Sequence, residues 1–275
     1  MILPHVQQRT AVVTGAASGL GAAMARYLAA AGFQVAVTDR NLQQADALLQ
    51  QHDFPAGSFA AELDVNQSAH WQQLQQRIND EWDGLGVLIN NAGVAAAGPM
   101  HEDPLDNWRW LFEVNVFGVT TGCQTFLPML LQQNNGHIIN IASFAALAGA
   151  PAMSNYGASK AAVFALSESL YTELAASEVA VSVACPAFIQ TALIDSMRAP
   201  EDSYKKRASR WMQNSAISAD DFAALVFQAA SKRRFLILTH TSTRWLWRLK
   251  RWLPAAYYGL LRRNVRQFAR RSKAG

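Results

Sequence analysis

Short apolar runs rich in β-branched side chains alternate with longer stretches of helical pattern through the first two hundred residues. The runs predicted as strands are Thr10–Thr14, Gln34–Thr38, Gly57–Leu63, Val87–Asn90, His137–Ala142 and Val179–Ala184. The stretches predicted as helices are Leu20–Ala31, Leu42–Gln51, Gln67–Glu81, Asn107–Gln133 and Asn155–Ser177. Continuously apolar strands are typical of sheets buried on both faces, and alternating strands and helices form parallel sheets. We therefore expect an α/β fold with one doubly wound parallel sheet and helices on both faces.

This alternation stops after Pro186. A polar segment of mixed charge, Thr191–Asn214, precedes a predicted helix near Ala219–Ser231 and a last apolar run, Arg234–Thr239. No linker rich in Pro, Gly or Ser divides the chain before this point, and 51% of the 275 residues are apolar, which is ample for a large core. We expect one domain over residues 1–240 and a separate extension over residues 241–275.

Charge is distributed unevenly along the chain. From Lys232 onward there are 13 of the 24 Lys and Arg, whereas the last of the 20 acidic residues is Asp221. The first 231 residues therefore carry 11 basic and 20 acidic side chains, a net charge of −9. A mildly acidic body followed by a strongly basic extension is a feature that any functional interpretation must accommodate.

Several classes of protein are disfavoured by composition. Cys123 and Cys185 are too few for a disulfide framework, which favours a reduced, cytoplasmic compartment. Residues 1–10 lack the apolar core of a signal peptide, and no apolar run reaches the ~18 residues of a membrane-spanning helix. The histidines have no partners at metal-ligand spacing, so we expect no metal; they are His5, His52, His70, His101, His137 and His240.

A glycine-rich loop joins the first predicted strand to the first predicted helix. Its sequence is Thr14-Gly15-Ala16-Ala17-Ser18-Gly19-Leu20-Gly21, with the spacing G-x3-G-x-G. Small residues let a backbone approach a pyrophosphate, and a helix N-terminus supplies N–H donors and partial positive charge. A tight strand–helix turn selected for packing is the alternative. Its position directly after the first strand favours cofactor binding by Gly15, Ser18, Gly19, Leu20 and Gly21.

The second predicted strand is followed by Asp39 and Arg40. A carboxylate at this position can accept hydrogen bonds from the adenosine ribose of NAD and repels the 2′-phosphate of NADP. Asp39 could instead be a helix-capping or turn residue, and the guanidinium of Arg40 could pair with a 2′-phosphate. The sequence favours NAD, with NADP as the alternative cofactor.

Tyr156 and Lys160 lie four residues apart in a predicted helix, so both side chains share one face. A tyrosine with a pKa near 10 is a poor base at neutral pH. A neighbouring ammonium stabilises the phenolate, and the tyrosine can then exchange a proton with a substrate oxygen. A Tyr–Lys pair by itself, however, is more often a surface feature.

Seven motifs in order make the chain resemble the short-chain dehydrogenase/reductase family over residues 8–240. They are TGAASGLG (14–21), Asp64-Val65, NNAG (90–93), Asn115 in VNVFG, Ser143 in NIAS, YGASK (156–160) and PAFIQT (186–191). The resemblance implies a single Rossmann-like domain with about seven strands. It also implies reversible hydride transfer between NAD(P)(H) and a secondary alcohol or ketone.

The resemblance further implies a role for each matching residue. Tyr156 is expected to be the general acid and base, with Lys160 lowering its pKa and holding the nicotinamide ribose. Ser143 is expected to bind the substrate oxygen, and Asn115 to hold a water molecule that connects Lys160 to solvent. The remaining cofactor contacts are expected from Asp64, Val65, Asn91, Ala92, Gly93, Ile189 and Thr191, with Thr191 at the carboxamide. Without the family pattern, Asn115 and Ser143 would be read as structural residues.

One position departs from the family pattern, because Ala187 follows Pro186 where the family usually has glycine. This change can tighten the nicotinamide loop but removes no reactive group. Residues 192–214 correspond to the family's substrate lid, where apolar and aromatic residues indicate a bulky or lipophilic substrate. The lid also carries a basic cluster, which fits a solvated helix face as well as an anionic substrate: Arg198, Lys205, Lys206, Arg207 and Arg210.

Two other functions were weighed. A membrane-associated interaction protein or cofactor sensor that keeps the fold would be expected to lack catalytic residues, but all four are present here. An epimerase or dehydratase usually has a longer chain and different glycine spacing.

The two long predicted helices, Asn107–Gln133 and Asn155–Ser177, carry more apolar residues than one core-facing side needs. We therefore expect a homodimer or homotetramer.

The basic extension lies outside the family pattern. Thr243–Leu253 is predicted as an amphipathic helix ended by Pro254, with Trp245, Leu249 and Trp252 on one face and arginines on another. A second basic stretch, Tyr257–Lys273, follows. Trp and Arg at this spacing favour peripheral binding to an anionic membrane. Packing of the aromatic residues on the body or on a partner subunit, over the substrate entrance, is the alternative, and nucleic-acid binding is disfavoured.

Overall fold

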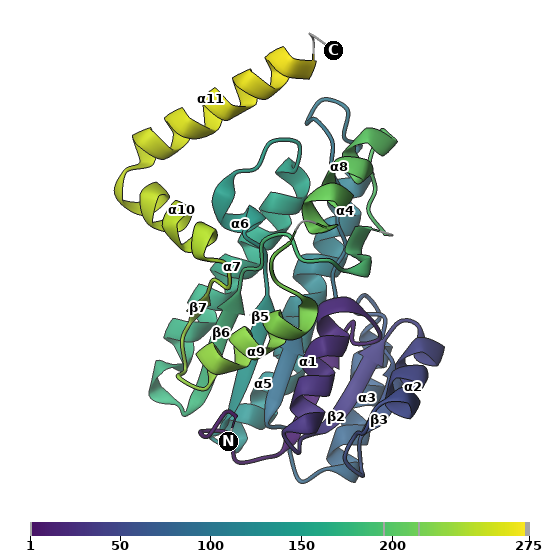
Figure 1. Ribbon diagram of the computed structural model, residues 1–275. Coiled ribbons are helices and arrows are strands. Elements are labelled where there is room, and N and C mark those ends of the chain that lie inside the picture. Colours follow the sequence, from purple (N-terminus) through teal and green to yellow (C-terminus); the bar gives the residue numbers. More distant parts are fainter. Residues whose placement is uncertain (1, 195, 214, 273–275) are drawn as a thin grey trace.

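The computed structural model describes residues 2–194, 196–213 and 215–272. Its centre is a seven-stranded parallel sheet in the order β3-β2-β1-β4-β5-β6-β7 (Figure 1). The strands are β1 (Thr10–Thr14), β2 (Gln34–Asp39), β3 (Phe59–Glu62), β4 (Val87–Asn90), β5 (Gly136–Ile141), β6 (Val179–Ala184) and β7 (Leu236–Ile237). The order reverses between β1 and β4, which makes this a doubly wound fold with a ligand crevice expected at the carboxyl ends of these two strands. The fold predicted from the sequence is confirmed.

Side chains that alternate along the strands form two cores, one on each face of the sheet. Val13, for example, belongs to one core and its neighbour Val12 to the other. Because successive side chains of a strand point to opposite faces, a buried strand must be apolar at every position. In the sequence TAVVT of β1 all five residues are buried, and the three central ones are apolar.

Helices cover both faces of the sheet. The helices of the body are α1 (Gly19–Ala30), α2 (Leu42–Gln51), α3 (Ser68–Glu81), α4 (Leu105–Phe112), α5 (Gly118–Gln132), α6 (Ala145–Ala148), α7 (Ser154–Glu173), α8 (Asp202–Gln213) and α9 (Ala219–Ala230). Helices α1 and α9 pack against one face through residues such as Leu28 and Phe227. Helices α3, α5 and α7 pack against the other face through Trp71, Phe126 and Val163.

The long helix predicted over Asn107–Gln133 contains an irregularity. A π-helical turn, η1 (Glu113–Phe117), separates α4 from α5, and the Gly118 amide donates to the Glu113 carbonyl. Contrary to the sequence expectation, the continuous helix Leu105–Gln132 is long and apolar enough to cross a membrane, as judged by length and composition over the described residues. In this fold it is a core helix, because Phe126 and Leu130 are fully buried beneath the sheet.

Other predicted boundaries shift by a few residues. Strand β3 covers four residues of the predicted Gly57–Leu63, and β7 covers only two of Arg234–Thr239. Asp39 is the last residue of β2. Two short 3-10 turns, η2 (Leu174–Ala176) and η3 (Ala192–Ile194), follow α7 and open the lid segment respectively.

The basic extension consists of two helices, α10 (Thr241–Trp252) and α11 (Pro254–Ser272). Pro254 ends the first helix, as predicted, and begins the second, where its missing N–H and fixed φ are tolerated. Figure 1 shows α10 beside the body and α11 running above α6, at the end of the molecule opposite the N-terminus.

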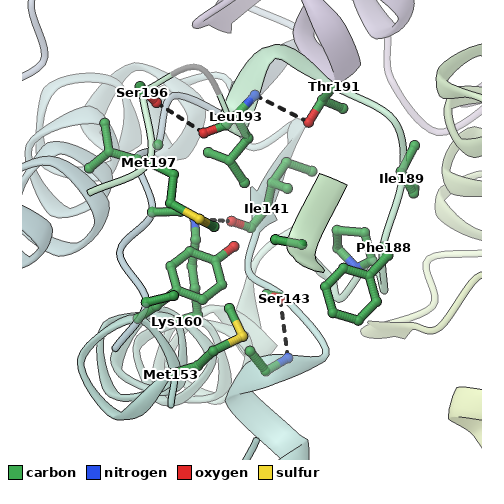
Figure 2. A pocket seen from close by; sticks show the side chains of 18 of the residues that line it. Ile141, Ser143, Met153, Lys160, Phe188, Ile189, Thr191, Leu193, Ser196 and Met197 are labelled. Atoms are coloured by element: carbon green, nitrogen blue, oxygen red, sulfur yellow. Dashed lines mark hydrogen bonds between the residues drawn. The ribbon is translucent and has the colours of Figure 1, made fainter. Parts of the chain in front are cut away.

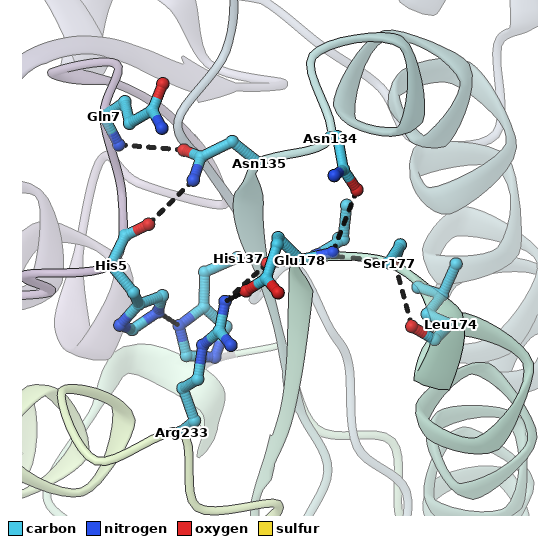
Figure 3. Close-up of polar contacts among 10 residues, drawn as sticks. His5, Gln7, Asn134, Asn135, His137, Leu174, Ser177, Glu178 and Arg233 are labelled. Carbon is cyan, nitrogen blue, oxygen red and sulfur yellow. Dashed lines mark hydrogen bonds and ion pairs between the residues drawn. The ribbon is translucent and has the colours of Figure 1, made fainter.

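A buried polar cluster lies at the amino end of the sheet. The Nε2 atom of His5 is 3.0 Å from Nδ1 of His137 (Figure 3). The Nε2 atom of His137 is 2.8 Å from the Ser182 hydroxyl. Burial lowers the pKa of both histidines, and the nearby positive charge of Arg233 lowers them further. Both imidazoles are therefore neutral at pH 7.

Candidate active site

The glycine-rich loop follows β1 and leads into α1. Gly15 and Gly19 have φ angles of +61° and +55°, which favour glycine. A Cβ atom on Gly15 would lie 2.9 Å from the Cα of Ala92, and one on Gly21 would collide with the carbonyl oxygen of Gly15. The loop is therefore packed closely against the segment that follows β4.

Two polar side chains hold this loop in place. The Asn91 side-chain amide donates to the carbonyls of Thr14 and Gly15 at 2.9 and 3.0 Å. The Thr14 hydroxyl accepts from the amides of Asn91 and Ala92, each at 3.0 Å. Asn91 was expected from the sequence at the cofactor, and its amide supports the loop that faces the cleft. The role of Thr14 was missed, because a threonine at a strand end carries no distinctive sequence signal.

The first turn of α1 keeps its N–H groups available. Ser18 occupies the N-cap position but makes no side-chain capping hydrogen bond. The first amides of a helix have no partner within the helix, so these donors can serve an anionic ligand. This geometry fits the pyrophosphate of a dinucleotide.

Asp39 lies at the carboxyl end of β2 and lines the same cleft as the glycine-rich loop. One carboxylate oxygen accepts from the Ala17 amide at 3.2 Å, and the other accepts from the Asn41 amide at 3.0 Å. These two bonds fix the carboxylate beside the loop. The neighbouring Arg40 is exposed and also lines the cleft.

Tyr156 and Ser143 meet at the carboxyl end of β5. Ser143 follows this strand, and Tyr156 is buried in the first turn of α7. Burial raises the pKa of Tyr156 to about 12, although the nearby Ser143 side chain acts in the opposite direction. In the cofactor-free protein the phenol is therefore protonated at neutral pH.

Lys160 lies one turn further along α7 and is buried. Its Nζ atom donates to the carbonyl of Ile141 at 3.0 Å, and burial lowers the pKa of Lys160 to about 8. The sequence indicated that this ammonium lowers the pKa of Tyr156. In this geometry the ammonium is directed to the strand end, and Ser143 is the group that favours the phenolate.

Asn115 is fully buried in the π-helical turn. Its oxygen accepts from the Val94 amide at 2.8 Å, and its amide donates to the Val94 carbonyl and the Ser159 hydroxyl, each at 3.0 Å. Asn115 thus joins the strand-end loop to α7. A Cβ on Gly93 would lie 3.1 Å from Oδ1 of Asn115 and 3.2 Å from Nζ of Lys160, so the backbone of Gly93 sits between these two side chains.

A cleft of about 1240 Å³ connects these groups. Figure 2 shows Ser143, Lys160, Met153 and Met197 gathered around one part of it. The predicted site residues that line the cleft are Gly15, Ser18, Leu20, Asp39, Arg40, Asp64, Val65, Asn91, Ala92, Gly93, Ser143, Tyr156, Lys160, Ile189 and Thr191. Gly19, Gly21 and Asn115 are not part of the lining and contribute to the geometry of the loop and of α7.

One face of the lid helix α8 contributes to the cleft. Tyr204, Arg207, Ala208 and Trp211 line it at helical spacing, together with Met212. The lid is joined to the strand-end loop by a bridge between Ala96 and Arg198, whose guanidinium also covers the ring of Trp110. Of the basic residues that the sequence left open, Arg207 lines the cleft, whereas Lys206 and Arg210 are exposed.

The extension packs on the body through one side of α10. Thr243 is buried, and the ring of Trp247 lies 6.4 Å from that of Phe164 on α7. Trp245 and Trp252, which the sequence placed on the apolar face of this helix, are 66% and 77% exposed. The side chains against the body, Thr243 and Trp247, thus lie outside the predicted apolar face, whose two tryptophans face solvent.

A doubly wound sheet, a glycine-rich loop at its switch point and a Tyr–Ser–Lys cluster beside the loop define the class of dinucleotide-binding oxidoreductases. Residues 9–202 match the model of the short chain dehydrogenase family. The chain belongs to the short-chain dehydrogenase/reductase family, and is an NAD(P)-binding oxidoreductase.

Relatives cover nearly the whole chain. A 1-deoxy-11-beta-hydroxypentalenate dehydrogenase of Streptomyces exfoliatus is 32% identical, over 87% of this chain and 86% of its own length. A fatty acyl-CoA reductase of Acinetobacter baylyi is 33% identical, over 86% of this chain and 77% of its own. A short-chain dehydrogenase/reductase structure from Burkholderia phymatum, in complex with NAD, is 35% identical with a TM-score of 0.82, and the match covers 90% of this chain and 94% of that one.

Proposed function

We propose that the protein interconverts a secondary alcohol and a ketone with NAD(H), and that Tyr156 transfers the proton. The observation that carries this proposal is the buried Tyr156 hydroxyl, close enough to Ser143 for that hydroxyl to lower its pKa, in a cleft that also contains Lys160 and the glycine-rich loop. The bound nicotinamide supplies the hydride chemistry, accepting hydride from the alcohol carbon or donating it to the ketone.

The residues of this chain position the substrate oxygen and move the proton. The Ser143 and Tyr156 hydroxyls hydrogen-bond the oxygen and orient the reacting carbon. In ketone reduction the Tyr156 phenol donates its proton as the oxygen gains charge, and in alcohol oxidation the phenolate accepts one. We infer that Lys160 holds the nicotinamide ribose and that Asn115 keeps a path for proton exchange beside Lys160, by fixing Val94 and Ser159.

A bulky or lipophilic substrate is supported by the lining of the cleft. The lining of the cleft that contains Tyr156 includes many apolar residues, alongside polar ones such as Ser196 and Arg207: Phe144, Ala148, Pro151, Met153, Leu193, Met197, Trp211 and Met212. Two relatives are named for a hydroxypentalenate and for a fatty acyl-CoA. Binding energy for an apolar substrate would come from covering this surface, at ~25 cal/mol per Å².

NAD(H) is the proposed physiological cofactor. The Asp39 carboxylate, fixed by the Ala17 and Asn41 amides, supports this proposal, because a carboxylate at the end of the second strand can accept hydrogen bonds from an adenosine ribose. A 2′-phosphate placed there would meet a like charge. Relatives in the solved structures include one in complex with NAD and one from Sphingobium yanoikuyae in complex with NADPH.

The test of the proposed function is turnover by Tyr156→Phe. A panel of secondary alcohols and ketones of increasing size is assayed with NAD(H) and NADP(H). On any substrate that is turned over, Tyr156→Phe should lose about 10²- to 10⁴-fold in kcat while the Kd for NADH stays within a few-fold. The exposed Tyr171→Phe, on the same helix, is the control. Near-full activity of Tyr156→Phe would refute the assignment of the proton donor.

We further propose a homo-oligomer and peripheral membrane association of a cytoplasmic protein. Phe117 and Leu131, on the long helix, are 54% and 43% exposed and are suited to a partner subunit.

Trp245 and Trp252 are exposed on α10, whose sequence neighbours include Arg244, Arg248 and Arg251. Exposed Trp rings beside arginines match the interface of an anionic bilayer. The alternative of a cofactor-sensing protein without catalysis is not favoured, because the catalytic residues are all present.

A further inference from the structure

The substrate end of the cleft is lined in part by the C-terminal extension. Leu261, Asn264 and Val265 of α11 contribute to the same cleft as Tyr156 and the lid helix α8. With Tyr257 they occupy positions i, i+4, i+7 and i+8, which is one face of a helix. On other faces of α11, Leu260 and Arg263 do not line this cleft, although Leu260 is as exposed as Val265, at 43% and 41%. The helix thus has a distinct side toward the cleft.

Three contacts hold α10 and α11 in this place. The Tyr257 hydroxyl donates to the Ala148 carbonyl at 2.6 Å, and Nζ of Lys250 donates to the Leu147 carbonyl at 2.5 Å. Tyr257 is 4% exposed. Both acceptors belong to the last turn of α6, where carbonyls have no partner within the helix and cations are favoured. The packing of Trp247 on Phe164 is the third contact.

The same short helix connects the extension to the reacting groups. Ala145, at the first residue of α6, donates its amide to Ser143, and its carbonyl lies against Gly157 of α7. Ala148, at the last residue, holds Tyr257. Helix α6 therefore contacts the reacting residue Ser143 at its first residue and α11 at its last residue.

We propose that Leu261 and Val265 are specificity-determining residues that bind the distal apolar part of the substrate. This inference rests on the proposed function and adds to it the size of the substrate. The substrate class is secondary alcohols and ketones with an extended aliphatic or alicyclic group. Short substrates react at Tyr156 without contacting α11.

The proposal is tested on the full-length protein with a short and a long substrate. We compare 2-butanol with 2-undecanol for NAD-dependent kcat/KM, in Leu261→Ala, Val265→Ala and the control Leu260→Ala. Each lost apolar contact lowers affinity only for the substrate that makes it. Leu261→Ala and Val265→Ala should therefore lower kcat/KM for 2-undecanol by about 10-fold, through KM, and leave 2-butanol within two-fold. Leu260→Ala should change neither.

Calorimetric titration with 2-undecanone in the presence of NAD⁺, which cannot reduce a ketone, provides a readout that does not need turnover. Leu261→Ala should weaken this binding by about 10-fold. Leu261→Trp, which fills the space, should exclude 2-undecanone but retain the reaction of 2-butanol. Equal losses for both substrates, unchanged binding of 2-undecanone, or the same loss in Leu260→Ala would overturn the proposal. Failure of the proposed function is distinguishable, because then neither substrate would be turned over by the unmodified protein.

Discussion

Burial raises the pKa of Tyr156 and lowers that of Lys160. The rates of alcohol oxidation and ketone reduction should therefore depend differently on pH. Alcohol oxidation requires the Tyr156 phenolate, and the pKa of Tyr156 is raised to about 12. Ketone reduction requires the protonated phenol, which is present throughout the neutral range. We expect kcat/KM for oxidation to rise between pH 6 and 9, by at most about tenfold per pH unit. Reduction should not rise over this range.

Lys160 titrates within the same pH range. Burial lowers its pKa to about 8, so its positive charge is lost as the pH passes that value. Initial rates in both directions, measured in one buffer series at constant ionic strength, check the prediction. Oxidation that is independent of pH from 6 to 9 would contradict the role of a titrating phenol.

Asp39 is expected to decide between the two cofactors. Asp39→Ala removes the charge that opposes a 2′-phosphate and leaves Arg40 free to pair with it. The ratio of kcat/KM for NADH over NADPH should fall by about 10-fold or more in Asp39→Ala. Asp46→Ala, an exposed carboxylate on α2, is the matched control. Stronger binding of NADPH than of NADH by the unmodified protein would contradict the assignment.

At the residue level, the sequence predicted those site groups that motifs place at fixed spacing. Asp39, Ser143, Tyr156 and Lys160 all line one cleft, because each follows a strand end or lies on the first turns of a helix there. The contribution of Leu261 was not predictable in this way. This contribution depends on how α11 packs over the cleft, and no local sequence pattern predicts that packing.

A buried histidine in strand β5 makes the stability of the protein depend on pH. His137 in this strand and His5 beside it are held neutral, because burial lowers the pKa of each below its ordinary value of about 6.5. Below about pH 6.5 the unfolded chain binds protons that the native protein does not, so stability falls as the pH is lowered. Above that pH the contribution is constant.

We expect the free energy of unfolding to fall by about 1.4 kcal/mol per pH unit for His137 between pH 6.5 and 5, and by less for the more accessible His5. Urea titrations at pH 7, 6 and 5 provide the measurement. His137→Gln should flatten this dependence, whereas His101→Gln, whose side chain is 80% exposed, should not. An identical pH dependence in His137→Gln and the unmodified protein would contradict the explanation.

Among elements, the strands and the regular helices were predicted from apolar periodicity, and the irregular ones were not. The turn η1 (Glu113–Phe117) lies in a run that reads as uninterrupted helix, and what identifies it is the pairing of Asn115 with Val94 from a distant loop. Helix α6 is only four residues long, too short for a periodic signal. Tertiary contacts define both.

For the whole molecule, the exposed side of the long helix predicts self-association. Phe117 is 54% exposed and Leu131, on the same helix, is 43% exposed; a charged residue at position 117 would be placed inside the proposed subunit interface. Phe117→Arg should lower the mass measured by light scattering at micromolar concentration to that of a monomer, 30.1 kDa. Its circular dichroism spectrum should be unchanged. A monomeric unmodified protein would contradict the prediction.

The exposed tryptophans of α10 predict binding to anionic membranes. The double variant Trp245→Ser/Trp252→Ser removes exposed rings and leaves Trp247, which packs on the body, in place. Co-sedimentation with phosphatidylserine vesicles at low salt should fall at least several-fold in the double variant. Met100→Ser, which removes a 63%-exposed apolar side chain from the body, should bind as the unmodified protein does. Absence of vesicle binding by the unmodified protein would contradict the membrane proposal.

The outer side of α11 places positive charge beside the cleft. Arg262, Arg263 and Arg266 are exposed within one turn of Leu261 and Val265, which line the cleft. One helical turn is shorter than the Debye length, which is roughly 10 Å at 0.1 M salt, so salt screens the arginine charges only partly at the cleft. The three guanidinium groups therefore form a positive field at the opening of an otherwise acidic body. Diffusing anions, including the dinucleotide itself, are steered toward the cleft, and their association slows as ionic strength rises.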